Sequence, residues 1–62
     1  MKYFHGWWVC HTTIDNFDDF NWCCEQFGKP EMNRRWFYNH VERKFYFGRE
    51  EDAMWYTLRW SA

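Results

Sequence analysis

Aromatic side chains have to build most of the interior of this chain, because it has few other large apolar residues. The 62 residues include six Trp, seven Phe and four Tyr. The branched aliphatic residues are only Val9, Ile14, Val41 and Leu58. A chain of this length buries about 60% of the surface that its unfolded form exposes, so residues 1–62 are expected to form one small domain. Disordered segments have few aromatic residues and a high net charge, whereas this chain has many and a formal charge of -1, so we expect it to fold.

Two elements are predicted in the first half of the chain. Tyr3 to His11 is aromatic and β-branched, which favours a strand with apolar side chains on both faces. Thr12 to Asp15 offers several N-cap candidates for a helix. Four apolar side chains then recur at helical spacing, namely Phe17, Phe20, Cys24 and Phe27. Gly28 followed by Pro30 predicts the end of this helix.

Two strands and a second helix are predicted in the second half. Asn33 to Val41 alternates in the manner of a strand, and Lys44 to Phe47 predicts a shorter one. Glu50 to Asp52 suits a helix N-terminus, where acidic side chains are favourable. Three apolar residues then share one helical face, namely Ala53, Tyr56 and Trp60. Residues 56–60 also alternate, so a final edge strand is the alternative for the C-terminus.

The predicted order of elements is β-α-β-β-α. Two helices on one face of a three-stranded sheet make an α+β fold, a two-layer sandwich. The order matches a ferredoxin-like fold that is truncated by the loss of its last strand, or a complete one if the C-terminus forms a short fourth strand. A right-handed crossover through the first helix would set the first two strands parallel if they share the sheet.

Charge and cysteine content limit the classes of partner. Residues 1–31 carry a net charge of -3 and residues 32–62 one of +2, so the chain lacks the basic excess of proteins that neutralise phosphates. The three cysteines, Cys10, Cys23 and Cys24, predict reduced thiols in a cytosolic compartment rather than a disulfide framework. No apolar run approaches the roughly 18 residues of a membrane span, and we expect neither a membrane protein nor a secreted precursor.

Metal-binding and catalytic patterns are weak. The cysteines and histidines match no zinc-finger or zinc-ribbon spacing. Cys23 could pair with His5 or His11 as a nucleophile, but the sequence shows no orienting carboxylate or oxyanion donor. Four carboxylates are expected on a solvated helix face, namely Asp15, Asp18, Asp19 and Glu25. We therefore expect a non-enzymatic protein with no catalytic residues, no metal and no cofactor.

More rings are present than one small core needs, so several are expected to form a surface patch on the sheet. Exposed aromatic side chains beside arginines are typical of protein-binding surfaces. The residues expected to bind a partner are Arg34, Arg35, Trp36, Tyr38 and Tyr46. The partner would be another protein or, in a homodimer, a second copy of the chain. Packing alone is the alternative explanation of the surplus rings.

Single-stranded nucleic acid is the less favoured partner. Bases stack on aromatic rings that are flanked by Arg and Lys, and residues 34–38 and 43–48 both juxtapose these residue types. The second stretch faintly resembles the aromatic strand of an RNA-recognition motif, but it lacks the glycine spacing of that motif. The overall charge also argues against this partner.

The C-terminal stretch from Phe45 to Trp60 ends in the pattern Asp-Ala-Met-x-aromatic-x-Leu-Arg-aromatic. This ending resembles that of small uncharacterised tailed-bacteriophage proteins. The resemblance covers sixteen of the 62 residues and fits Asp52, Ala53, Met54, Tyr56, Leu58, Arg59 and Trp60. It implies a phage origin, a location in the host cytoplasm and a host or viral protein as the partner, but no mechanism.

Overall fold

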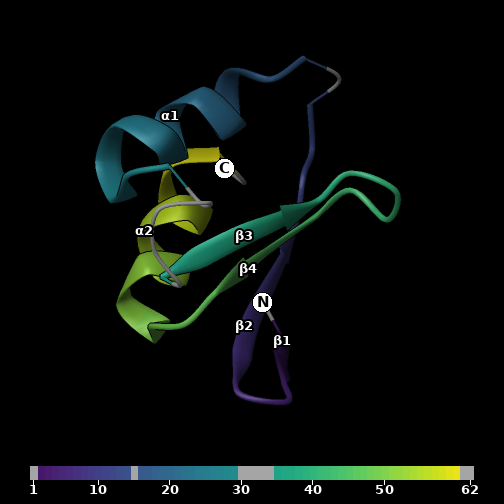
Figure 1. Cartoon of the computed structure of the whole chain (residues 1–62), viewed down its shortest axis with the longest axis vertical. Coiled ribbons are helices and arrows are strands. Elements are labelled where there is room, and N and C mark those ends of the chain that lie inside the picture. The colour runs from purple at the N-terminus through teal and green to yellow at the C-terminus, as the bar shows by residue number, and fades with distance from the viewer. Residues whose placement is uncertain (1, 15, 30–34, 61–62) are drawn as a thin grey trace.

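The computed structural model describes residues 2–14, 16–29 and 35–60 of the chain. Within these residues the elements follow the order β-β-α-β-β-α. They are β1 (Lys2–Phe4), β2 (Trp7–His11), α1 (Asp18–Phe27), β3 (Trp36–Asn39), β4 (Lys44–Phe47) and α2 (Glu50–Trp60). The protein is therefore a small α+β protein with an antiparallel sheet and two helices, in agreement with the predicted class (Figure 1).

The N-terminal segment forms a hairpin rather than the single strand expected from Tyr3 to His11. β1 pairs antiparallel with β2, so that Phe4 lies opposite Trp7. The turn between them consists of His5 and Gly6, whose φ angles are 50° and 87°. Two-residue hairpin turns favour positive φ because their twist then matches that of the strands, and glycine adopts such angles without strain. The predicted element order was wrong by this one strand.

The strands lie in the sheet in the order β1-β2-β4-β3, and each neighbouring pair is antiparallel. It follows that β2 and β3 run in the same direction with β4 between them. The chain passes from β2 to β3 through α1, so the expected parallel relation of these two strands is confirmed. β1 and β3 form the two edges of the sheet.

The first helix ends where the sequence predicts and begins later. Gly28 follows α1 with a φ angle of 84°, and its N–H donates to a carbonyl of the last turn at 3.0 Å. The N-cap position belongs to Phe17 rather than to a residue between Thr12 and Asp15. The side-chain oxygen of Asn16 accepts a hydrogen bond from the backbone N–H of Asp18 at 3.0 Å. The start of α1 is therefore satisfied by a neighbouring side chain outside the cap itself.

The second helix continues through Trp60, which confirms the predicted helix and excludes the alternative of an edge strand over residues 56–60. Its first turn carries Glu50, Glu51 and Asp52, and its last turn carries Arg59. These charges are favourable at the respective helix ends. Neither of the two described helices has the length and apolar character of a membrane-spanning segment.

The core lies between one face of the sheet and both helices. Its most deeply buried large side chains are Trp36, Phe45, Phe47 and Tyr56, together with Cys23 of α1. Of the predicted stripe, Phe27 belongs to the core and Phe20 and Cys24 pack against it, as expected. Phe17, at the N-cap, is instead 63% exposed, and the inward face of α1 also includes the fully buried Cys23. The helix α1 carries aromatic and cysteine side chains on more than one of its sides. Helical spacing alone was therefore consistent with two neighbouring stripes of buried residues.

Candidate functional site

The face of the sheet that points away from both helices carries a group of aromatic side chains. Phe37, Tyr46 and Val9 are paired across three neighbouring strands, so their side chains lie on the same face. Trp7 is two residues from Val9 and is paired with Phe4, so these two share that face. The core residues and both helices lie on the other side of the sheet. We call the surface formed by these five residues the open face.

Three rings of the open face, those of Trp7, Phe37 and Tyr46, contact one another. Phe37 and Tyr46 are stacked, with ring centroids 4.5 Å apart and planes at 4°. The indole of Trp7 meets the Phe37 ring at 83° with centroids 4.8 Å apart. The flat surfaces of the Phe37 and Tyr46 rings cover each other across neighbouring strands, so these two rings present their edges to the solvent. Ring edges carry a partial positive charge, so the surface suits oxygen atoms and apolar groups better than a flat stacked base.

A groove of about 240 Å³ lies beside Tyr46 and crosses β1, β2 and β4. Val9 is its most buried lining residue, and Phe4 and Tyr46 contribute rings. The charged or ionisable lining residues are Lys2, His11, Glu42 and Lys44. Glu42 Oε1 lies 3.8 Å from Lys44 Nζ and accepts a hydrogen bond from the Tyr46 hydroxyl at 3.5 Å. The groove therefore combines an apolar base with two lysines set against one carboxylate.

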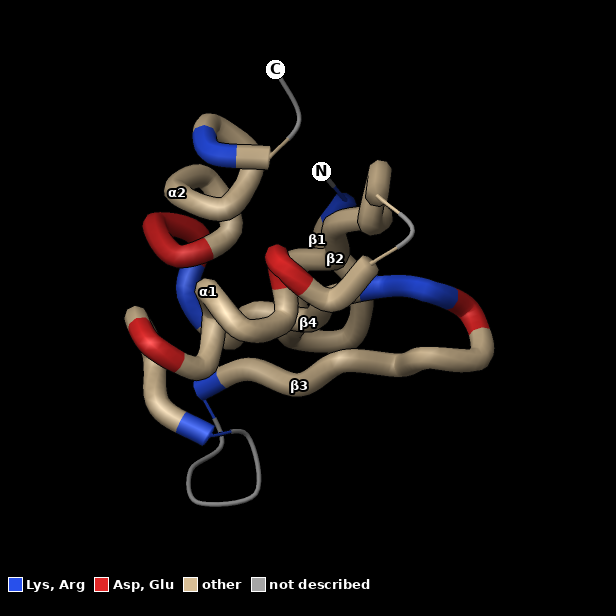
Figure 2. Tube along the Cα trace, turned by 90° about the horizontal axis from the view of Figure 1, so that it is seen from above, with Lys and Arg blue, Asp and Glu red and all other residues tan. Residues whose placement is uncertain are grey.

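Charges of opposite sign are divided between the two layers of the molecule. Among the described residues, the strands and the residues directly beside them carry Lys2, Arg35, Arg43 and Lys44 against Glu42, a balance of +3. The helices and the residues beside them carry Lys29, Arg49 and Arg59 against Asp18, Asp19, Glu25, Glu50, Glu51 and Asp52, a balance of -3. Figure 2 shows acidic positions on both helices, and basic positions at the start of β1 and in the stretch that joins the β3–β4 turn to β4. The nearly neutral total charge therefore conceals a basic sheet layer.

The structure separates the five residues that the sequence predicted to bind a partner. Trp36 is 1% exposed and its ring belongs to the core, so it is not available as a surface anchor. Tyr38 is half-buried and packs against the same core. Arg35 is held by α2, and Arg34 lies outside the described residues. Among the four of these residues that the structure describes, Tyr46 alone lies on the open face.

The sequence reasoning missed three rings of the open face, Phe4, Trp7 and Phe37. Strand alternation correctly put Trp36 and Phe37 on opposite faces, but both faces are aromatic, so alternation could not show which one the helices cover. The signal that identifies the open face is cross-strand pairing, because Phe37 lies opposite Tyr46.

A second hollow, of about 520 Å³, lies between α1 and the end of β3. It is lined by Phe17, Phe20, Asn21, Tyr38 and His40. No Lys, Arg, Asp or Glu lines it, in contrast to the groove on the open face. The ring of Phe17, which is 63% exposed, meets the solvent beside this hollow.

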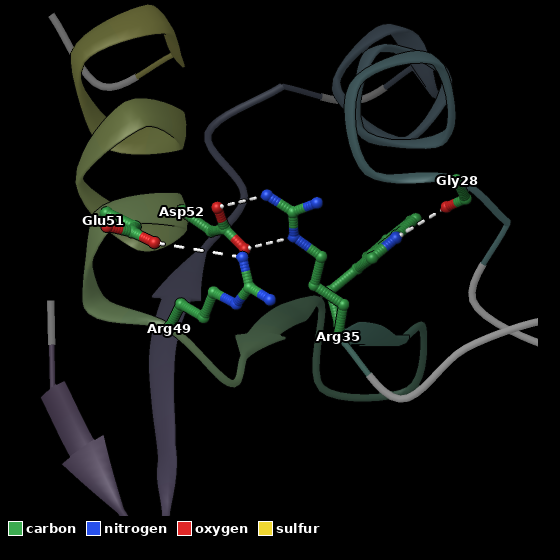
Figure 3. A network of polar contacts seen from close by, with 6 residues as sticks. Gly28, Arg35, Arg49, Glu51 and Asp52 are labelled. Atoms are coloured by element: carbon green, nitrogen blue, oxygen red, sulfur yellow. Dashed lines mark hydrogen bonds and ion pairs between the residues drawn. The ribbon is translucent and has the colours of Figure 1, made fainter.

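Arg35 and Asp52 form a bidentate ion pair that joins the start of β3 to α2 (Figure 3). Arg35 Nε donates to Asp52 Oδ2 at 2.7 Å, and Nη2 donates to Oδ1 at 3.0 Å. The guanidinium also lies over the ring of Phe27, 5.0 Å from its centroid. The hydrogen bond to Asp52 raises the pKa of Arg35 above its ordinary value. The pair therefore has a structural role, and it directs the Arg35 guanidinium toward α2.

Asp19 is buried, although the sequence placed it on a solvated helix face. Its Oδ2 accepts hydrogen bonds from the Thr12 hydroxyl at 2.6 Å and from the Tyr56 hydroxyl at 2.8 Å. Its Oδ1 accepts from the backbone N–H of Phe20 at 2.8 Å. These partners satisfy the carboxylate inside the protein, as a buried charge requires. Asp18 and Glu25 are exposed as expected, and Asp15 lies outside the described residues.

The buried thiols are not set up for nucleophilic chemistry. Burial raises the pKa values of Cys10 and Cys23 above the ordinary range, and the nearby charge of Asp19 adds to the effect at Cys23. A thiol with a raised pKa carries little of the thiolate that attacks electrophiles. Cys10 Sγ instead contacts the Ala53 carbonyl at 3.9 Å. Within the described residues no three His, Cys, Asp or Glu side chains are grouped as metal ligands.

The free energy of unfolding is expected to fall as the pH rises above about 9, where unfolded thiols begin to ionise. Burial, and at Tyr56 the hydrogen bond to Asp19, raise the pKa values of Cys10, Cys23 and Tyr56. The folded protein therefore keeps protons that the unfolded chain releases, so this stability is present at neutral pH and is lost in alkali. Each group contributes a slope of up to about 1.4 kcal/mol per pH unit.

Urea unfolding at a series of pH values from neutral to strongly alkaline measures this loss. In Tyr56→Phe the decline above about pH 10, where a free tyrosine ionises, should be shallower than in the parent protein. A free energy of unfolding that stays constant through this range would contradict the burial of these three groups.

Comparison with known proteins adds no assignment to this surface. No family model, curated protein or solved structure matches the chain. The geometry and charge of the open face therefore provide the basis of the functional proposal.

Proposed function

We propose that the chain is a small non-enzymatic binding module that docks on another protein through the open face of its sheet. The observation that supports this most directly is a group of rings on a face that neither helix covers. Phe4 and Phe37 are 52% and 38% exposed, and Trp7 and Tyr46 are half-buried beside them. A contiguous aromatic patch of this kind marks an interaction surface in proteins that are otherwise well packed.

The partner that fits this face is a protein with an acidic surface that also carries apolar side chains. The sheet layer has a positive balance, and the groove places Lys2 and Lys44 beside an apolar base formed by Val9. Carboxylates of the partner would lie near the two lysines, and an apolar side chain would enter the groove. The outward ring edges favour the same oxygen-rich surface.

A phage origin, action in the host cytoplasm and a host or viral protein as the partner belong to this proposal. They are supported by the resemblance of residues 45–60 to the ending of small tailed-bacteriophage proteins. Affinity purification from infected host cells, followed by mass spectrometry, would identify the partner.

Phe37→Ala should weaken binding of the purified partner at least about 10-fold, since truncation of central aromatic residues is costly at interfaces. The matched control is Phe17→Ala, which removes an exposed ring from the other side of the molecule and should leave the affinity unchanged. Surface plasmon resonance measures both variants, and circular dichroism checks that both are folded. If Phe17→Ala alone loses the partner, the second hollow is the binding site and the proposal for the open face is wrong.

Single-stranded nucleic acid is the second candidate partner, and the positive balance of the sheet layer favours it. Fluorescence anisotropy with a labelled single-stranded oligonucleotide tests it directly. A nucleic-acid binder would show an affinity that falls steeply with salt and that is lost in Lys44→Glu. We expect no binding at low salt, because the rings of Phe37 and Tyr46 stack on each other and present edges rather than faces.

We also propose that the fold is a variant of the ferredoxin-like arrangement. The unit β2-α1-β3-β4-α2 has the predicted β-α-β-β-α order, and β4 lies between β2 and β3. β1 then lies at the sheet edge beside β2, where a ferredoxin-like domain has its last strand. An experimental structure would test this relation by comparison of the strand directions.

A further inference from the structure

The outward face of α2 carries large apolar side chains that the described elements of the fold leave about half exposed or more. Leu58, the one leucine in the chain, is 77% exposed, and Met54 and Trp55 are 48% and 47% exposed. Their spacing puts them on one side of the helix, opposite the buried Ala53 and Tyr56. We call Met54, Trp55 and Leu58 the α2 stripe.

The ring of Trp55 is held in place on its inner side by two rings of α1. Its ring meets that of Trp22 at 84°, with centroids 5.3 Å apart, and that of Phe27 at 83°, with centroids 5.7 Å apart. A ring that is held by the core and still exposed on its outer side loses little conformational freedom when a partner covers it. Trp55 is therefore a preformed part of the stripe.

The charges at the two ends of the stripe are of opposite sign. Glu50 and Glu51 lie in the first turn of α2, and Arg59 lies in the last. Glu51 has a long contact of 4.0 Å with Arg49, and the guanidinium of Arg59 rests over the Trp60 ring, 4.7 Å from its centroid. All of these charged side chains are exposed.

Such a pattern is complementary to a second copy of itself in the antiparallel orientation. Turning one helix end for end places apolar side chains against apolar side chains and the acidic end of each helix near the basic end of the other. The parallel orientation would place like charges together. Self-complementarity of a single patch is what a twofold symmetric dimer requires.

We propose that the α2 stripe is the contact of a homodimer, in which two α2 helices pack antiparallel about a twofold axis. Leu58 of each copy would pack against Met54 and Trp55 of the other. A pair of helices with 11 residues each buries less surface than the roughly 1,200 Å² typical of stable complexes, so the dimer is expected to be weak and concentration-dependent. This inference is independent of the proposed function, because the open face lies on the other side of the sheet from α2.

Light scattering coupled to size-exclusion chromatography tests the dimer over concentrations from about 10 to about 500 µM, a range suited to small interfaces. The mass of the parent protein should rise from 8.0 kDa toward twice that value. Leu58→Glu places a carboxylate in the apolar centre and should raise the dissociation constant at least about 10-fold. Since Leu58 is largely exposed, the variant should remain folded by circular dichroism.

A matched control and a charge exchange make the test specific. The control Val41→Glu introduces the same carboxylate at a residue of the β3–β4 turn that is 82% exposed, and this variant should dimerise as the parent does. Glu51→Arg and Arg59→Glu should each weaken the dimer, and the double variant should recover affinity, because an antiparallel pair restores the opposite charges.

Two results would overturn the inference. These are a mass of 8.0 kDa at every concentration and a dimer that survives Leu58→Glu. If that surviving dimer is lost in Phe37→Ala, self-association belongs to the open face. Loss of partner binding in Phe37→Ala with an unchanged dimer would instead support both proposals separately.

Discussion

Trp36→Ala is expected to be largely unfolded in buffer at room temperature. The ring is 1% exposed and lies between Phe45, stacked at 6.1 Å, and Phe20, edge-on at 5.5 Å. Its indole N–H also donates to the Gly28 carbonyl at 2.8 Å. Truncation of a buried tryptophan costs about 3–5 kcal/mol. That is as much as the roughly 3–5 kcal/mol of net stability that a single core of this size supplies.

Far-UV circular dichroism and urea unfolding measure this effect, and Phe37→Ala is its matched control. Phe37 is the next residue of the same strand, but its side chain points to the open face and is 38% exposed. Its truncation should cost about 1 kcal/mol and leave a folded protein. A Trp36→Ala variant with the unfolding midpoint of the parent would show that the assignment of the two faces is reversed.

Arg35→Met is expected to lower the free energy of unfolding by about 3 kcal/mol, because it leaves the buried carboxylate of Asp52 without its partner. The Asp52 side chain is 3% exposed and its two oxygens accept both hydrogen bonds from the guanidinium. Arg35 itself is one-third exposed, so this value is at the lower end of the range for buried ion pairs. Both the sheet and the helices should lose stability, because the ion pair joins β3 to α2.

Two further variants separate the unpaired charge from the loss of contacts. Arg35→Lys keeps the positive charge but cannot form the bidentate pair, so its stability should lie between those of the parent and Arg35→Met. The double variant Arg35→Met with Asp52→Leu removes both charges and should recover much of the stability that Arg35→Met loses. Equal urea midpoints for Arg35→Met and the parent would contradict a structural role for the pair.

The parts of the fold that could be predicted from the sequence are those with local signals. Gly28 marks the end of α1, acidic residues mark the start of α2, and alternation marks Lys44 to Phe47. The hairpin turn at His5 and Gly6 was not predicted, because aromatic residues on both sides make the segment read as one strand. Local patterns cannot distinguish a continuous strand from two strands that reverse over a two-residue turn of this composition.

The candidate surface was predicted only in part, because burial depends on residues that are distant in the sequence. Asp19 and Asp52 have the local character of solvated helix residues, and only the fold brings Tyr56 and Arg35 to them. The same limit applied to the choice between the two sheet faces, since each carries large rings. Some rings were correctly expected at the surface, but Trp36 was wrongly predicted to be one of them, since it is buried in the core.

Among the described residues, the division of charge between sheet and helices gives an electric dipole that points from the helical layer toward the sheet layer. An approaching acidic protein would exert a torque on this dipole and turn the open face toward itself before contact. Oriented encounters of this kind raise association rates at low ionic strength and have less influence on dissociation. Added salt should therefore slow the capture of such a partner more than it shortens the lifetime of the complex.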